Sequence, residues 1–327
     1  MISKPNPESS HVLDRVLVLE MVRVTEAAAI AASKLIGRGD EDAADAAAVE
    51  AMRRAFDDLA IDGTVVIGEG ERDEAPMLYI GEPVGGSPGK GPKIDIALDP
   101  LEGTSITAKA GANALAVLAA AEEGCLLHAP DVYMDKIAVG PGYPPDVISL
   151  DRSVRENVEA VAEAKGCKPD EIIVCVLDRP RHADLIAQLR ETGCGIQLIP
   201  DGDVAGVIAT TNEETTIDLY MGVGGAPEGV LAAAALRCTG GQFNGRLLFR
   251  NDDERARATK CGIEDLDRIY KLDDLAKGDC IFAATGVTDG SLLGGVKRFR
   301  GVMTTESVVM RASSGTVRWV TGEHRTD

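Results

Sequence analysis

Six consecutive residues, Asp99 to Thr104, combine side chains that could bind a metal ion. Their sequence, Asp-Pro-Leu-Glu-Gly-Thr, puts two carboxylates three positions apart at a turn that Pro100 makes rigid. Hard divalent cations prefer oxygen ligands, and the N–H groups beside a glycine can bind an anion. Taken alone, such a stretch is more often an ordinary polar turn than a metal site. The other acidic turns of this sequence favour the metal site.

Two of these acidic turns lie before Asp99. The turn 68–74 follows a short buried strand expected over 64–67, and its glycines would let another group approach closely. Asp45 lies near the start of a helix expected over 43–59, among more carboxylates than the helix dipole needs. A solvated loop and a dipole-complementing charge are the simpler interpretations. Together with Asp99, however, the two turns indicate a cluster of oxygen ligands.

A glycine-rich turn at 222–229 raises the alternative of a dinucleotide site, because it follows an expected strand and opens a helix. Its spacing does not fit G-x-G-x-x-G, since Pro227 stands where the third glycine should be. In the other interpretation, Glu228 in the first helical turn points its carboxylate into the same cleft as Asp99. The sequence favours this second interpretation.

A basic turn, Arg179-Pro180-Arg181-His182, follows one expected strand and precedes a helix. Two guanidinium groups at a helix N-terminus could hold a phosphate, because arginine binds phosphate in a bidentate way. A solvated basic turn is about equally compatible with the sequence. His182 and the seven dispersed cysteines receive no chemical role.

An acidic turn, Asp201-Gly202-Asp203, follows the next expected strand. Its carboxylates could accept hydrogen bonds from sugar hydroxyls. They could equally cap the helix that comes after them. Both interpretations stay open at the level of sequence.

Composition restricts the class of protein. The 327 residues are 45% hydrophobic and 27% charged, which is typical of a globular enzyme of one or two domains. A net charge of −19 argues against a nucleic-acid partner, which needs a broad cationic face. Seven cysteines without a C-x-x-C pair predict reduced thiols in the cytoplasm. We expect no secretion signal and no membrane span, because no apolar run is long enough.

The order of helices and strands predicts an α/β protein. Asp99 is expected to end its strand, because Pro100 cannot donate to a ladder. A proline-rich linker at 141–145 predicts a domain boundary near residue 148, dividing the chain into 1–148 and 149–327. The remaining helices are expected over 12–35, 154–165, 183–189, 203–210 and 227–237. Strands over 94–99, 114–120 and 135–139 are expected in one sheet. We expect further strands over 77–80, 172–177, 196–199, 216–221 and 281–284, and a hairpin over 306–321.

The stretch Asp99–Thr104 resembles the Asp-Pro-x-Asp/Glu-Gly-Thr/Ser signature of the metal-dependent, lithium-sensitive sugar-phosphatase superfamily. Other stretches narrow the resemblance to the class II fructose-1,6-bisphosphatases of the bacterial glycerol-regulon type, from about residue 12 to residue 322. These stretches are Gly37–Asp40, Ile67–Glu71, Asp73–Gly81, Ala129–Asp131, Pro200–Ala205 and Gly224–Gly229.

The resemblance implies a set of site residues. The family's metal ligands fall on Asp45, Glu69, Asp99, Glu102 and Glu228. Its substrate contacts fall on Glu102, Gly103, Thr104, Tyr133, Arg179, Pro180, Arg181, Asp201, Gly202, Asp203 and Gly225. Two positions depart from some relatives: Glu41 and Arg179 each stand where those relatives have lysine.

The resemblance further implies a layered α/β/α/β/α fold with the site between two sheet-containing halves. We expect a cytoplasmic, Mn²⁺- or Mg²⁺-dependent enzyme of carbohydrate metabolism that removes the 1-phosphate of fructose 1,6-bisphosphate. Thr104 would orient the attacking water, helped by Asp73 or Glu74. A homodimer or homotetramer is expected. The alternatives are a sedoheptulose-1,7-bisphosphatase or dual-specificity enzyme, an inositol-phosphate-type phosphatase, and a non-catalytic protein that binds a metal or a metabolite.

Overall fold

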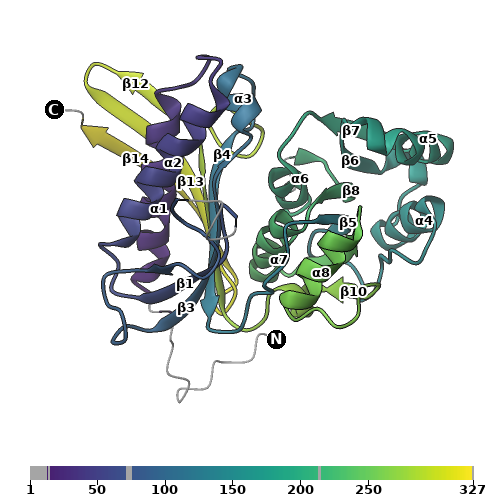
Figure 1. Cartoon of the computed structure of the whole chain (residues 1–327). Helices are drawn as coiled ribbons and strands as arrows, with labels where there is room; N and C mark the ends of the chain where they lie inside the picture. The colour runs from purple at the N-terminus through teal and green to yellow at the C-terminus, as the bar shows by residue number, and fades with distance from the viewer. Residues whose placement is uncertain (1–12, 14, 71–75, 213–214, 326–327) are drawn as a thin grey trace.

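The chain forms five layers, helix, sheet, helix, sheet and helix (Figure 1). The computed structural model describes residues 13, 15–70, 76–212 and 215–325. This layered α/β architecture confirms the fold class expected from the sequence. In the described part of the chain, no helix is long and apolar enough to cross a membrane.

The first outer layer consists of α1 (Leu17–Ser33) and α2 (Glu41–Phe56). Asp40 begins α2 by accepting a hydrogen bond from the Ala43 N–H at 2.9 Å, which satisfies one of the free donors of the first turn. Met21, Met52 and Phe56 are completely buried on the faces that meet the first sheet. The regular spacing of apolar side chains therefore predicted both helices.

The first sheet has eight strands in the order β12-β13-β11-β4-β3-β1-β2, and β14 pairs with β13. β1 and β3 pair in parallel, and the other pairs are antiparallel. The strands are β1 (Asp62–Ile67), β2 (Pro83–Val84), β3 (Lys93–Glu102), β4 (Leu115–Glu122), β11 (Cys280–Gly286), β12 (Lys297–Phe299), β13 (Val302–Arg311) and β14 (Thr316–Arg325). Helices cover both faces of the central strands, and β4 is accordingly an almost unbroken apolar run.

The second sheet has six strands in the order β10-β9-β5-β8-β6-β7. They are β5 (Tyr133–Val139), β6 (Ile173–Leu177), β7 (Gly195–Ile199), β8 (Leu219–Gly225), β9 (Gln242–Leu248) and β10 (Ile269–Lys271). β6 and β7 pair in parallel and flank α5 (Ala183–Thr192), as the strand–helix alternation predicted. With α4 (Val154–Lys165), α5 forms the last layer (Figure 1). A capping box of Ser153 and Glu156 begins α4.

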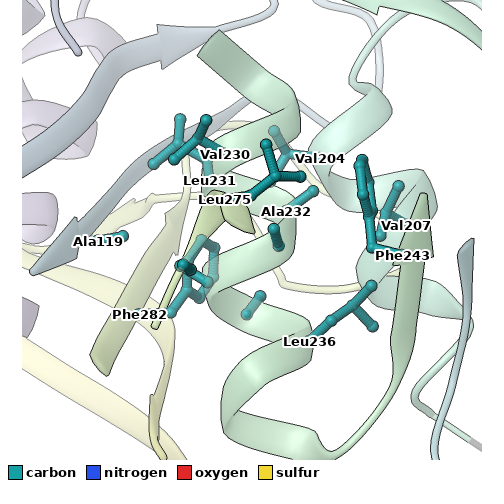
Figure 2. Close-up of a cluster of buried hydrophobic side chains, with 14 of the residues drawn as sticks. Ala119, Val204, Val207, Val230, Leu231, Ala232, Leu236, Phe243, Leu275 and Phe282 are labelled. Atoms are coloured by element: carbon teal, nitrogen blue, oxygen red, sulfur yellow. The ribbon is translucent and has the colours of Figure 1, made fainter. Parts of the chain in front are cut away.

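The middle layer consists of α6 (Asp203–Ala209) and α7 (Ala226–Thr239). Figure 2 shows Leu231 and Leu236 of α7 among Phe282 of β11 and Phe243 of β9, which belong to the first and second sheet. Residues 232–235 of α7 are four consecutive alanines, and all are buried. Small side chains thus allow one helix to pack closely between two sheets.

Three local expectations were wrong. β5 is not a strand of the first sheet, because it pairs with β8 and β9. Residues 77–80 form no strand, since Leu78 has a positive φ of 55° and the segment folds back by hydrogen bonds to Glu69 and Gly70. Asp99 does not end β3, which continues through an irregular register to Glu102. A bulge can accommodate a proline without an N–H, so Pro100 bends the strand and does not stop it.

The two sheets alternate along the chain. β5 precedes residue 148 and belongs to the second sheet, whereas β11 to β14 come after residue 148 and belong to the first. The segment 251–277 contains α8 (Asp252–Lys260), β10 and α9 (Leu272–Leu275). β2, β9, β10 and β12 were not predicted, because their short or polar sequences give no clear alternation.

Candidate active site

A cavity of about 410 Å³ lies among the ends of β1, β3 and the first turns of α6 and α7. Seven of its lining residues are carboxylates that the sequence had singled out. They are Asp45, Glu69, Asp99, Glu102, Asp201, Asp203 and Glu228. Gly103, Thr104 and Gly202 line the same cavity. The structure therefore brings all five implied metal ligands to one place.

Strand pairing explains how Glu69 and Asp99 come together. β1 and β3 run in parallel, and Ile67 of β1 lies opposite Ala97 of β3. Glu69 and Asp99 each come two residues later, so they lie at the same end of the sheet. The irregular register between Asp99 and Glu102 turns both carboxylates of β3 toward the cavity wall. Asp45 reaches the cavity from α2.

Glu228 reaches the cavity from the first turn of α7. Its carboxylate lies directly over Gly225, where the Cβ of any other residue would overlap Glu228 Oε2. Gly225, an implied substrate contact, therefore has a visible structural reason to be glycine. The residue gives Glu228 the space to fold back toward the cavity.

Burial and mutual repulsion raise the pKa values of the cavity carboxylates. Burial raises the pKa of Asp99 well above its usual range, and Glu69 and Glu228 raise it further. Burial and Asp45 raise the pKa of Glu69 to about 7. For Glu102 the causes are burial, Asp203 and Asp99, in that order. A cation in the cavity would relieve this repulsion.

Two buried carboxylate oxygens provide a test of whether a metal fits. Glu102 Oε2 and Glu228 Oε2 are buried and have no hydrogen-bond partner among the described residues. An unsatisfied carboxylate oxygen is costly to bury unless a cation accompanies it. Among the described residues, no group of three or more His, Cys, Asp or Glu side chains lies close enough together to form a complete metal site. The cavity is thus lined by hard oxygen donors of the kind that Mg²⁺ and Mn²⁺ prefer.

Thr104 is the first residue of the short helix α3 (Thr104–Ala108), next to Glu102. Gly103 before it has a φ of 92°, which glycine adopts without strain. Glu41, at the position where some relatives have lysine, accepts a hydrogen bond from the Ser105 hydroxyl at 2.7 Å. Asp73 and Glu74, the expected helpers of Thr104, lie outside the described residues.

The basic turn lies beside the cavity and does not line it. Arg179 forms an ion pair of 3.2 Å with Asp201, which is a lining residue. Arg181 donates two hydrogen bonds to the Val223 carbonyl, at 3.0 and 2.7 Å, and its guanidinium carbon lies 5.0 Å from the centre of the Tyr133 ring. Pro180 begins a 3-10 helix, Pro180–His182. Among these implied substrate contacts, Arg179 thus contacts the cavity wall through Asp201, and Arg181 contacts Tyr133.

Sequence reasoning missed two buried polar residues next to this site. Lys136 of β5 has a completely buried side chain and pairs with Asp203 at 2.5 Å. His182 is 1% exposed, accepts the Val223 N–H through Nε2 at 2.8 Å and donates Nδ1–H to the Leu177 carbonyl at 2.7 Å. Lys136 did carry a signal, since it alternates in phase with two apolar residues of β5, Met134 and Ala138.

The chain matches a family model described as "Bacterial fructose-1,6-bisphosphatase, glpX-encoded" over residues 15–324. It is 47% identical to the fructose-1,6-bisphosphatase 1 class 2 of Escherichia coli strain K12, over 96% of both chains. The same identity and coverage hold for the class 2 fructose-1,6-bisphosphatases of Escherichia coli O6:H1 strain CFT073 and of Shigella flexneri.

Proposed function

The chain belongs to the glpX-encoded bacterial fructose-1,6-bisphosphatases, and we propose that it hydrolyses the 1-phosphate of fructose 1,6-bisphosphate at the carboxylate-lined cavity. The products are fructose 6-phosphate and inorganic phosphate, so the enzyme is a phosphoric monoester hydrolase that acts in gluconeogenesis. The observation that carries the assignment of the site is the gathering of Asp45, Glu69, Asp99, Glu102 and Glu228 around one cavity. Glycerol metabolism, expected from the resemblance, stays a proposal.

Divalent cations, Mn²⁺ or Mg²⁺, would be held by these five carboxylates. When bound, they would neutralise the charge of the reacting phosphate and lower the pKa of a water molecule. The two unpartnered oxygens of Glu102 and Glu228 support these residues as ligands. The ligand set requires three layers, because Asp45 belongs to α2, Glu69 follows β1 of the first sheet and Glu228 belongs to α7 of the middle layer.

Residues of this chain would orient the reaction. We assign the Thr104 hydroxyl to hold the attacking water, because Thr104 lines the cavity two residues after Glu102. Asp73 or Glu74 would accept a hydrogen bond from that water or its proton. Asp201 and Asp203 would accept hydrogen bonds from sugar hydroxyls, since both line the cavity opposite β3. Holding water and phosphate in line accounts for much of such catalysis.

The phosphate that is not cleaved needs its own cations, because the protein carries a net charge of −19. Arg181 supports this role, since the Val223 carbonyl and the Tyr133 ring fix its guanidinium group before any ligand arrives. Arg179 is next to the sugar-binding end through its ion pair with Asp201. Arginine is well suited to such sites, because its planar group binds phosphate oxygens in pairs.

A substrate panel tests the proposed function. Phosphate release would be measured with fructose 1,6-bisphosphate, sedoheptulose 1,7-bisphosphate and an inositol phosphate, each with Mn²⁺, with Mg²⁺ and after chelation. We expect the highest kcat/KM with fructose 1,6-bisphosphate and none after chelation. Preference for sedoheptulose 1,7-bisphosphate would reassign the substrate, and no release from any compound would favour a binding protein.

We also propose that the enzyme is cytoplasmic and forms a homodimer or homotetramer. Seven free cysteines support a reducing compartment. Trp319 and Val317 on β14 are 54% and 42% exposed at the edge of the first sheet, which supports a contact with another copy. Light scattering coupled to gel filtration would test the oligomer, and a monomeric mass at micromolar concentration would contradict it.

A further inference from the structure

Lys136 places a completely buried positive charge next to the candidate active site. Its Nζ lies 2.5 Å from Asp203 Oδ2, and the two side chains are 0% and 7% exposed. Lysine is almost never fully buried unless it is paired, and Asp203 is the carboxylate that pairs with it here. Neither the family's metal ligands nor its substrate contacts include this residue.

Two glycines, Gly224 and Gly229, make room for the pair, and two more flank the lysine in the sheet. Lys136 stands between Gly222 of β8 and Gly245 of β9, so no side chain flanks it in the sheet. At Gly224 a Cβ would overlap Asp203 Oδ2 and would lie 3.1 Å from Lys136 Nζ. At Gly229 of α7 a Cβ would lie 3.4 Å from Lys136 Cε. The backbone around the lysine is therefore shaped for it.

The pair is connected to the cavity by α6. Asp203 is the first residue of α6 and lines the cavity. The next residue, Val204, donates its N–H to Glu102 Oε1 at 2.9 Å. Lys136 thus fixes the turn that holds both a sugar-binding candidate and a partner of a candidate metal ligand.

Stability alone is a weak explanation for such a pair. Desolvation of two charges offsets most of their attraction, and apolar replacements of buried ion pairs are often neutral or stabilising. The position of Asp203 in the cavity wall indicates a functional explanation for the pair. Asp203 has two carboxylate oxygens, and the ammonium group holds one of them while the residue lines the cavity.

We propose that Lys136 is a positioning residue that holds Asp203 in the orientation in which it accepts a hydrogen bond from the sugar. The proposal rests on the proposed function, in which Asp203 contacts the substrate. Without the ammonium group, the Asp203 side chain would lose its fixed rotamer and its buried partner. Substrate and product would then bind more weakly, while the cleavage step would be less affected.

The test compares Lys136→Met with a matched control, Lys165→Met. Lys165 also pairs with a buried aspartate, Asp218, at 2.5 Å, but on α4 and outside the cavity. For each variant we would measure KM and kcat for fructose 1,6-bisphosphate. We would also measure the affinity for fructose 6-phosphate by calorimetry and the midpoint temperature of thermal unfolding. We expect Lys136→Met to raise KM and weaken product binding about tenfold or more, the effect of losing a hydrogen bond to a charged group. Lys165→Met should lower the thermal midpoint only.

Asp203→Asn and the double variant Lys136→Met/Asp203→Asn complete the test. If Lys136 acts through Asp203, the double variant binds no more weakly than Asp203→Asn. Additive losses, or wild-type KM and product affinity in Lys136→Met, would overturn the proposal. Should Lys136→Met not fold, the comparison of the double variant with Asp203→Asn still decides, because the double variant removes both charges and the asparagine oxygen of Asp203→Asn can still accept a hydrogen bond from the Lys136 ammonium group. A wild-type enzyme that does not hydrolyse fructose 1,6-bisphosphate would instead refute the proposed function.

Discussion

Glu102 and Val204 are joined by a hydrogen bond across the cavity wall, in which Glu102 Oε1 accepts the backbone N–H of Val204 at 2.9 Å. Glu102 ends β3 of the first sheet, and Val204 lies in the first turn of α6 in the middle layer. The other carboxylate oxygen of Glu102 is buried without a partner among the described residues. One side chain therefore connects two layers and keeps one oxygen for a cation.

Replacing Glu102 by glutamine should separate stability from activity. Glu102→Gln can keep the bond to Val204 but removes a charge that Asp99 and Asp203 repel. We expect the metal-free variant to unfold at a higher temperature than the wild type, and kcat/KM to fall on the order of 10³-fold, about 4 kcal/mol. Thermal unfolding and phosphate release measure the two effects.

Glu82 provides the control for that substitution. It is a buried carboxylate outside the cavity and pairs with Arg53 at 2.5 Å. Glu82→Gln should therefore lose stability and keep its activity. A near-normal rate in Glu102→Gln would mean that Glu102 is not a metal ligand.

Glu228 should contribute to metal affinity from the middle layer. We expect Glu228→Gln to weaken Mn²⁺ binding at least about tenfold, because one charged oxygen ligand is lost. Calorimetric titration with Mn²⁺ measures the affinity directly, without turnover. Glu26→Gln is the control, since Glu26 is buried beside Thr305, far along the first sheet. Equal affinity in wild type and Glu228→Gln would remove Glu228 from the ligand set.

Arg181 should act on the phosphate that is not cleaved. Arg181→Ala should raise KM for fructose 1,6-bisphosphate more than it lowers kcat, because binding at the remote end positions the sugar. The loss should shrink for fructose 1-phosphate, which lacks the remote group. Arg190 in α5 is an exposed arginine outside the cavity, so Arg190→Ala should leave KM and kcat unchanged for both substrates. An equal loss for both substrates in Arg181→Ala would contradict the assignment.

His182 should make stability depend on pH. Burial, with smaller effects of Arg181 and Arg179, lowers the pKa of His182 below its usual value, and the neutral ring accepts the Val223 N–H. The unfolded chain then binds more protons than the folded one below about pH 6.5, so this contribution to stability is lost as the pH falls through that range. In denaturant unfolding, the difference in the free energy of unfolding between wild type and His182→Gln should become smaller from pH 7.5 to pH 5.5. A constant difference would show that His182 does not titrate in this way.

Much of the site could be predicted because it depends on local sequence. A carboxylate after a buried strand or in a first helical turn can be recognised without knowing the sheet order, as Glu69 and Glu228 show. The parallel pairing of β1 and β3 then brings Glu69 to Asp99. The same reasoning placed α1, α2 and α4.

The remainder depends on contacts that local patterns do not contain. β5 follows the first-sheet strand β4 in the chain but pairs with β8, about 85 residues away, a choice made by tertiary packing. Lys136 pairs with glycines on both neighbouring strands, and Gly224 of β8 leaves space for its Nζ. The role of His182 could not be predicted, because its hydrogen-bond partner, the Val223 N–H, lies on β8, far away in the sequence.

The most direct test of the central claim is phosphate release from fructose 1,6-bisphosphate by the chelated enzyme before and after Mn²⁺ is restored, with the remaining sugar phosphate identified by a coupled assay. We predict no release after chelation, recovery with Mn²⁺ and fructose 6-phosphate as the product. Asp99→Asn should not recover, because it loses a charged oxygen among the cavity carboxylates. Full activity after exhaustive chelation, fructose 1-phosphate as the product, or wild-type recovery in Asp99→Asn would contradict it.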